Sequence, residues 1–366
     1  MSGTRRLRDD PKLRRAFEAQ AETCDKMDAP FNGRVCRLLV EHLDDGSALG
    51  RRVLDWPREH LGADLVTLRC CAGLHALARM GRVPALGEVY PPKGANDGRL
   101  WAALAEAITQ EDAFLAAYLD SAPQTNELGR SAVLLGGVLA LVGKVPLPIA
   151  LYEVGASAGL NLLFDHWGYD LGAGGEGRGR TWGPDDAPVR VSCDWTGAMP
   201  DRDAPFDVRR RDASDLLPLD ASNPRDRERL LSYIWPDQFD RIERTVKAMD
   251  AVARAGMVVE KAEARDWVAR ALAPERAEPG VTTLLFHSVF IQYLDPPVRE
   301  ALVADIVKRG EAARNETPFA WMRMEAGRRD PARCELWLTL WPGGDERHMA
   351  DVDWHGRHAH WREGAA

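Results

Sequence analysis

The hydrophobic pattern of the chain changes near residue 146, and this change constrains the fold more than any other feature. Before it, apolar residues recur three or four positions apart, which is typical of helices. The helical segments are residues 13–24, 33–43, 62–80, 100–119 and 127–142. After it, short apolar runs of strand type alternate with helical patterns. We therefore expect a helical N-terminal region over residues 1–146 and an α/β domain over residues 147–366.

The second half of the chain has the element order of a doubly wound sheet. Strand-type runs occupy residues 149–154, 282–289, 319–326 and 335–341. A less regular run ends near Asp212, and residues 257–272 read as a further strand that continues into a helix. Helical patterns follow several of these runs, which predicts a mostly parallel, Rossmann-like sheet with helices on both faces. Residues 348–361 predict an antiparallel hairpin at the sheet edge. Residues 168–207, which begin with a glycine-rich stretch, are expected to be an insertion.

Composition excludes several classes of partner. The net charge of −8 over 366 residues argues against a nucleic-acid-binding protein, which needs a dense basic surface. The apolar run 132–142 is too short to span a bilayer, and no apolar run follows the basic N-terminus as in a secretory signal. The six cysteines form no C-x-x-C pair. We expect a cytoplasmic protein that acts on a small molecule, without a membrane or nucleic-acid partner.

Residues 151–165, LYEVGASAGLNLLFD, carry the most informative motif and allow two interpretations. Gly155–Gly159 fits G-x-S-x-G, the nucleophile elbow of serine hydrolases, with Asp295 as the acid and His355 or His358 as the base. Against this, the residues before the motif are helical, whereas an elbow strand normally follows several sheet strands. The His-Gly-Gly oxyanion signature is also missing upstream.

The second interpretation is a glycine turn that holds a cofactor. In a doubly wound sheet the ligand lies at the carboxyl ends of the strands, where the strand order reverses. Acids at the ends of successive strands suit a nucleoside with free hydroxyls, and suit a cationic sulfonium better than a pyrophosphate. On this interpretation Ser157 is a small loop residue. The expected cofactor contacts are Glu153, Gly155, Ser157, Gly159, Asn161, Asp212 and Glu263.

Two segments resemble the class I S-adenosylmethionine-dependent methyltransferases. LYEVGASAGLN looks like their first motif, with Ser157 in place of the middle glycine, and residues 282–302 are similar to their fourth strand and the following helix. On this comparison Asp295 begins that helix. The resemblance implies S-adenosylmethionine as the cofactor and methyl transfer to a small molecule.

A closer resemblance covers most of the chain. Five motifs in one order look like the bacterial domain of unknown function 2332 family: residues 124–135, 152–167, 232–244, 286–294 and 338–344. The activity of that family is unassigned, so this resemblance informs the architecture more than the function. A serine hydrolase that uses Ser157 and a non-catalytic nucleoside-binding module stay as alternatives.

Other polar groups are candidates for contact with the substrate or for catalysis. Asn126 and Arg130 precede an apolar helix, where they are either helix-capping groups or substrate ligands. Trp235, Asp237 and Gln238 precede another helix and are expected to contact substrate. His287, at a strand end, is the candidate general base, and Tyr293 follows it.

No metal site is expected from the sequence. The C-terminal segment 348–361 contains several histidines and aspartates, but neither a cysteine nor a second spaced cluster accompanies them. The sequence therefore favours a terminal hairpin there.

Overall fold

The computed structural model describes residues 4–172, 181–328, 330–362 and 364, and the chain forms two compact units. Unit 1 contains the residues up to Thr125 together with Asn223–Val246, and unit 2 contains Asn126–Ser222 together with the residues from Lys247 onward. The chain therefore leaves unit 1, builds part of unit 2, returns for one short segment and then completes unit 2.

Unit 1 is built from helices, and its described residues contain no strand. Its elements are η1 (Leu7–Asp9), α1 (Pro11–Lys26), α2 (Pro30–His42), α3 (Ala48–Leu54), α4 (Val66–Arg79), α5 (Pro84–Gly87), α6 (Asp97–Gln110), α7 (Asp112–Tyr118), α9 (Pro224–Ser232) and the first half of α10 (Phe239–Arg254). The start of α1 shows how the sequence sets these elements. Pro11 occupies its first position, and the Asp10 side chain accepts hydrogen bonds from two backbone N–H groups of the first turn.

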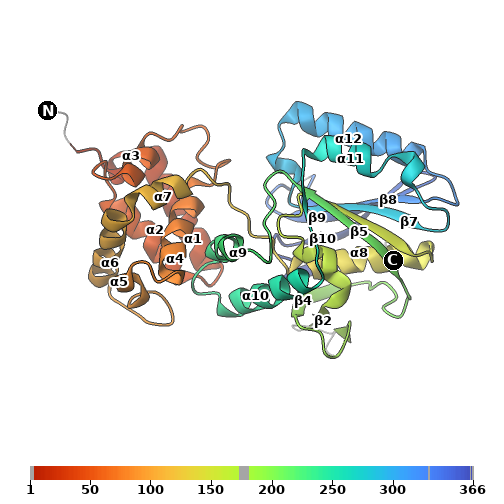
Figure 1. The fold of residues 1–366 in the computed structure, drawn as a ribbon, viewed down its shortest axis with the longest axis horizontal. Helices are drawn as coiled ribbons and strands as arrows, with labels where there is room; N and C mark the ends of the chain where they lie inside the picture. The colour runs from red at the N-terminus through yellow and green to blue at the C-terminus, as the bar shows by residue number, and fades with distance from the viewer. Residues whose placement is uncertain (1–3, 173–180, 329, 363, 365–366) are drawn as a thin grey trace. The chain divides into compact units, whose positions relative to one another are not determined.

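Unit 2 is an α/β unit around one 11-stranded sheet (Figure 1). Its elements are α8 (Arg130–Lys144), β1 (Ile149–Val154), η2 (Leu160–His166), β2 (Gly168–Leu171), β3 (Thr181–Trp182), β4 (Arg190–Gly197), β5 (Val208–Asp215), the second half of α10, β6 (Glu260–Lys261), α11 (Ala264–Ala271), η3 (Pro274–Arg276), β7 (Thr282–Ser288), η4 (Ile291–Tyr293), α12 (Pro296–Glu311), β8 (Phe319–Ala326), β9 (Cys334–Trp341), β10 (Asp345–Val352) and β11 (His358–Trp361).

The sheet order is β3-β2-β4-β11-β10-β9-β8-β7-β1-β5-β6. The segment β6-β5-β1-β7-β8 is parallel throughout. Numbered by their own order in the chain, these five strands run 3-2-1-4-5, the order that begins the classic dinucleotide-binding sheet. The expectation of a mixed α/β unit with a mostly parallel sheet is confirmed.

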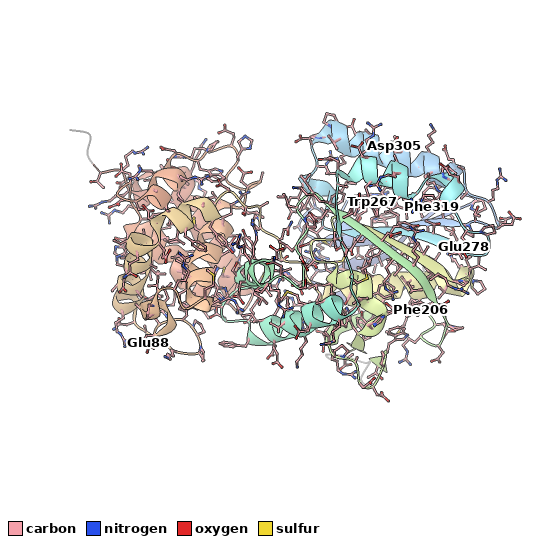
Figure 2. The ribbon with its side chains drawn as sticks, in the orientation of Figure 1. Glu88, Phe206, Trp267, Glu278, Asp305 and Phe319 are labelled. Carbon is pink, nitrogen blue, oxygen red and sulfur yellow. The ribbon has the colours of Figure 1, made fainter. Side chains whose placement is uncertain are left out.

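Helices cover both faces of the sheet. On one face α8 contacts β4, β8 and β9, and on the other α11 and α12 pack over β5, β8 and β9 (Figure 1). Gly136 of α8 permits a close approach, because a β-carbon there would lie 2.4 Å from the Trp195 ring. In the other layer, Trp267 of α11 and Phe319 of β8 belong to one buried apolar cluster (Figure 2).

The C-terminal hairpin does not lie at the sheet edge, so that expectation is wrong. Strands β10 and β11 pair antiparallel as expected, but β11 also pairs in parallel with β4. The expected insertion supplies β2, β3 and β4, which extend the sheet beyond the hairpin. Residues 173–180, within the glycine-rich stretch, lie outside the described residues.

Among the described residues, no helix is both long enough and apolar enough to cross a membrane.

Candidate functional site

The candidate site lies at the point where the parallel strand order reverses. From β1 the chain proceeds to β5 and β6 on one side, and it later returns to β7 and β8 on the other. Ligands of doubly wound proteins bind outside the carboxyl ends of the strands at such a switch point. Here the groups at these strand ends are the turn Gly155–Gly159 after β1, Asp215 at the end of β5, and Val289–Phe290 after β7.

The turn after β1 has a left-handed backbone at three positions. Gly155, Ser157 and Gly159 have φ values of +71°, +54° and +72°. Glycine adopts this region without steric cost, whereas serine does so rarely. Ser157 is therefore a non-glycine residue in a sparsely populated conformation, which is a feature of both functional turns and nucleophile elbows.

Every backbone N–H from residue 155 to residue 160 already has an acceptor within unit 2. The Asp215 carboxylate accepts from Ser157 N at 2.8 Å. The Asn126 side chain accepts from Ala158 N at 3.3 Å and from Leu160 N at 3.0 Å. The other three N–H groups donate to the backbone oxygens of Ser214 and Ala156. A phosphate bound at a glycine turn needs free N–H donors, and this turn does not offer them.

Glu153 is a buried acid at the carboxyl end of β1. It is 1% exposed, and burial together with the nearby Asp215 charge raises its pKa well above the usual value, an effect that Arg130 opposes. Its Oε2 atom has no hydrogen-bond partner among the described residues, and the same holds for Oδ1 of Asn161, which is also 1% exposed. Buried polar atoms without partners are rare and need an explanation, such as a ligand.

Asp212 does not end its strand, so the expected strand end is wrong by three residues. Strand β5 continues to Asp215, and Asp212 pairs in register with Tyr152 inside the sheet. Its carboxylate forms an ion pair with Arg210. The expectation failed because RRRDASD carries three arginines and little apolar character, so its strand length was underestimated. Asp215 is the carboxylate at the strand end.

Asn126 and Arg130 both contribute to the ordering of this region. Asn126 holds the glycine turn through the two N–H groups described above. Arg130 donates from Nε to Trp354 O at 2.9 Å and from Nη1 to Ser288 O at 3.2 Å. Burial lowers the pKa of Arg130, and Glu127 opposes that shift. The guanidinium thus connects the start of α8 with the end of β7.

His287 is not placed to act as a general base. Its Nε2 accepts from the Trp321 indole N–H at 3.1 Å, so the proton of the neutral ring lies on Nδ1, which faces Glu325. The ring is 1% exposed, and both nitrogens are in use. Glu325 also accepts from the backbone N–H groups of Phe290 and Ile291. The pair His287–Glu325 therefore orders the turn after β7, which argues against the expected catalytic role.

Phe290 covers the glycine turn. A β-carbon added to Gly155 would lie 2.3 Å from Phe290 Cδ2, so the ring occupies the space that Gly155 leaves open. The preceding residue, Val289, has φ +52°, which is a strained conformation for a β-branched side chain. Strain of this kind at a switch point is characteristic of functional sites.

The remaining predicted residues lie in three different surroundings. Tyr293, in η4, is 59% exposed. Glu263 is exposed just after β6. Asp237 and Gln238 belong to unit 1, where Asp237 accepts from Phe31 N at 2.9 Å and Gln238 Nε2 donates to Met27 O at 3.3 Å. These two residues hold the region around the start of α2.

Trp235, also in unit 1, is partly buried, and its carbonyl accepts from Gln238 N. Of the three predicted substrate contacts in that segment, the two polar ones therefore make hydrogen bonds within unit 1. Their contact with a substrate stays a prediction.

Two residues of the site were not predicted, Asp215 and Glu325. Asp215 was missed because the sequence pattern placed the end of β5 too early. Glu325, one residue before the end of β8, pairs with Glu335 of β9, and its partner His287 lies on the neighbouring strand β7. A pairing between strands 38 residues apart in the chain leaves no local signal in the sequence.

The sequence was compared with known families, curated proteins and solved structures. Residues 14–361 match the family described as an uncharacterized protein conserved in bacteria, DUF2332. The chain belongs to this family. Neither the curated proteins nor the solved structures gave a match. Membership of DUF2332 confirms the family resemblance of the five motifs, and the function has to be argued from the site.

Proposed function

We propose that this DUF2332 protein binds S-adenosylmethionine at the carboxyl ends of β1 and β5 and transfers its methyl group to a small molecule. The observation that carries the proposal is the pair of acids at this edge. Glu153 has a buried oxygen without a partner, and Asp215 ends the next parallel strand. The 3-2-1-4-5 order of the parallel strands, with Glu153 and Asp215 beside its switch point, supports the same assignment.

The hydrogen bonds of the turn favour a cationic ligand over a phosphorylated one. Dinucleotides and nucleotides need N–H donors for their phosphates, and the donors of residues 155–160 are already used. S-adenosylmethionine instead presents an ammonium group and ribose hydroxyls, which donate hydrogen bonds, and a sulfonium, whose positive charge is stabilised by carboxylates. Glu153, Asp215 and Asn161 are acceptors.

The residues of the site would bind and orient the two reactants. S-adenosylmethionine supplies a methyl group on a positively charged sulfur, and its transfer depends mainly on alignment of the acceptor. Asp215 would accept from the ribose hydroxyls, and Glu153 would accept from the amino group. Phe290 excludes water from the space beside Gly155 and has to move to admit a ligand there. No described side chain is assigned as a general base.

The test is a calorimetric and thermal-shift screen of the full chain against S-adenosylmethionine, S-adenosylhomocysteine and NAD. A ligand at a hundred times its Kd stabilises a protein by about 2.7 kcal/mol, which a melting curve detects readily. We expect both adenosyl ligands to bind and NAD not to bind. Absence of a response to both adenosyl ligands would refute the proposal. Binding without turnover of any acceptor would favour the nucleoside-binding module.

The positive φ of Ser157 also favours a second candidate, a serine hydrolase. Two observations oppose it. The N–H of the next residue, Ala158, would form the oxyanion hole but is bonded to Asn126. His358, one of the two predicted bases, lies 3.2 Å from Asp194, whereas the predicted acid is Asp295. A fluorophosphonate probe decides between the candidates. Labelling that disappears in Ser157→Ala would establish the hydrolase, and we expect no labelling.

A further inference from the structure

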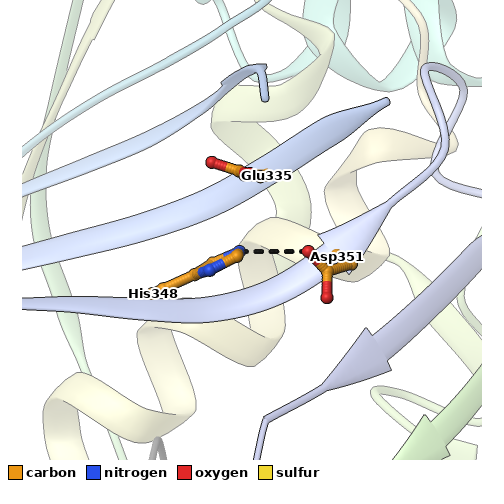
Figure 3. Close-up of side chains that lie close together, drawn as sticks. All are labelled: Glu335, His348 and Asp351. Atoms are coloured by element: carbon orange, nitrogen blue, oxygen red, sulfur yellow. Dashed lines mark ion pairs between the residues drawn. The ribbon is translucent and has the colours of Figure 1, made fainter. Parts of the chain in front are cut away.

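A second group of polar side chains lies on strands β9 and β10, away from the glycine turn. Glu335 of β9 and His348 and Asp351 of β10 each offer one ligand-type atom, and these atoms all lie within 4.8 Å of one another (Figure 3). We propose that these three residues form a binding site for a divalent transition-metal ion. The proposal is independent of the function proposed above.

The distances fit a single ion. His348 Nε2 lies 3.3 Å from Asp351 Oδ1. Two ligands that each lie about 2.0–2.1 Å from a tetrahedral Zn²⁺ are about 3.3 Å apart. The Glu335 oxygen lies within 4.8 Å of both atoms, and a metal ion has to replace the contact that His348 Nε2 makes with Ala350 O at 3.2 Å. One imidazole with two carboxylates suits Zn²⁺ and related ions better than Ca²⁺, which prefers oxygen ligands alone.

The strand register explains why the three residues meet. Asp351 pairs with Glu335, and His348 pairs with Trp337, with an irregularity between His348 and Ala350. Without this irregularity, residues 348 and 351 would point to opposite faces, because side chains alternate along a strand. The extra residue brings His348 and Asp351 to the face that carries Glu335.

Neighbouring groups hold two of the ligands in position. Glu335, which is 9% exposed, accepts from the Trp337 indole N–H at 2.8 Å and from Arg328 N at 3.1 Å through Oε2. The Trp337 ring stacks on His348, with ring centroids 4.6 Å apart. Contacts that orient a ligand's second atom or ring are a regular feature of metal sites.

A cavity on the same part of the sheet is the second, independent observation. It has a volume of about 580 Å³, and Asp351 is one of its lining residues. Four other lining residues are of metal-ligand type, namely Asp194, Asp353, His358 and His360. Three protein ligands leave one position of a tetrahedral ion for water or a further ligand. The cavity provides room for that ligand.

Arg362 opposes the binding of a cation and so provides a sharp test. Its Nη2 atom contacts both carboxylate oxygens of Asp351, at 3.1 and 2.8 Å. A metal ion has to compete with this charge. Removal of the guanidinium in Arg362→Gln should therefore tighten metal binding, whereas a purely structural ion pair predicts no effect on metal affinity.

The experiment is a titration of the tag-free full chain, stripped with a chelator, with Zn²⁺ in competition with a chromophoric chelator. We expect one equivalent of Zn²⁺ to bind, and binding to weaken at least about tenfold in His348→Gln, Glu335→Gln and Asp351→Asn. The matched control is His166→Gln, because His166 has an aspartate 3.9 Å away but belongs to no three-residue group found among the described residues. Co²⁺ absorption reports the geometry.

Two results would overturn the proposal. The first is the absence of stoichiometric Zn²⁺ binding by the wild-type chain. The second is Zn²⁺ binding that survives unchanged in His348→Gln. Melting curves of each variant without metal identify loss of folding, and the nearly isosteric Glu335→Gln supplies a ligand change that keeps the shape of the side chain.

Discussion

The Phe290 ring lies where a β-carbon of residue 155 would be, at 2.3 Å from its ideal position. Gly155 is thus required twice, for its φ of +71° and for the space that the ring fills. The turn after β1 and the turn after β7 are packed against each other. A substitution in one turn is therefore expected to displace residues of the other turn.

Gly155→Ala should destabilise unit 2 more than an alanine substitution at a glycine that has a left-handed backbone but open space around it. The expected cost is about 2–4 kcal/mol, because left-handed strain adds to displacement of the ring. Gly280→Ala is the matched control: Gly280 has φ +78° and no atom within 4 Å of the added carbon, so about 1–2 kcal/mol is expected. Urea unfolding of both variants measures the difference, and equal costs would contradict the packing argument.

Asp215→Asn should weaken S-adenosylmethionine binding, whereas Asp212→Asn should not. Loss of a hydrogen bond to a charged acceptor costs about 1.5–3 kcal/mol, which corresponds to a roughly 10- to 100-fold increase in Kd. Asp212 is the control because it lies on the same strand, three residues from the end, and is paired with Arg210. Calorimetry on the two variants decides. A larger effect from Asp212 would instead support Asp212 as the residue that contacts the cofactor.

The local patterns predicted the elements well where the apolar periodicity was strong. β1, β7 and β8 begin at the expected residues, because each is a run of buried apolar side chains. β5 was cut short because arginines occupy its exposed positions. The sequence also gave no indication that β4 pairs with β11, since that register joins residues 164 positions apart, such as Thr196 and His360.

The candidate site was predicted in part for the same reason. Glu153 and the turn Gly155–Gly159 were found because they are contiguous in the chain. The use of the turn's N–H groups by Asn126 and Asp215 was not foreseen, because both acceptors are distant in sequence. His287 was identified from its position at a strand end, but its two partners, Glu325 and Trp321, come from the next strand.

The free energy of unfolding should decrease as the pH falls, because His75 in the helical unit is kept neutral by folding. Burial, with a smaller effect of Arg79, lowers its pKa from 6.5 to about 3, so the folded state keeps the ring neutral. The unfolded chain takes up a proton below pH 6.5, so between pH 6.5 and 3 the free energy of unfolding decreases by up to about 1.4 kcal/mol per pH unit.

His75→Asn should reduce that slope in urea unfolding between pH 7 and 5. The amide does not titrate, and it retains a donor for the bond that His75 Nδ1 makes to Ser232 O at 3.1 Å. The exposed His166 is the control position, and His166→Asn tests the effect of replacing a histidine that is not buried. An identical pH dependence in His75→Asn and the wild type would show that His75 does not contribute.

Glu153→Gln should make the protein more stable and, at the same time, a weaker binder. The pKa of Glu153 is raised above 4.5 in the folded state, chiefly by burial, so above pH 4.5 folding retains a proton that the unfolded chain releases. This lowers the stability of the wild type by up to about 1.4 kcal/mol per pH unit, until the folded pKa is reached. Glutamine does not titrate, so the advantage of the variant should be absent at pH 4 and large at pH 8.

Ligand binding should change in the opposite direction, because the wild-type carboxyl can release its proton when the ammonium group of S-adenosylmethionine binds beside it, whereas the amide cannot become negatively charged. Urea unfolding at pH 4 and pH 8, with calorimetry at pH 8, measures both effects on one variant. A buried acid that costs stability and is needed for binding is the pattern of a functional residue. Higher stability with unchanged affinity would remove Glu153 from the binding site, and lower stability at pH 8 would contradict its raised pKa.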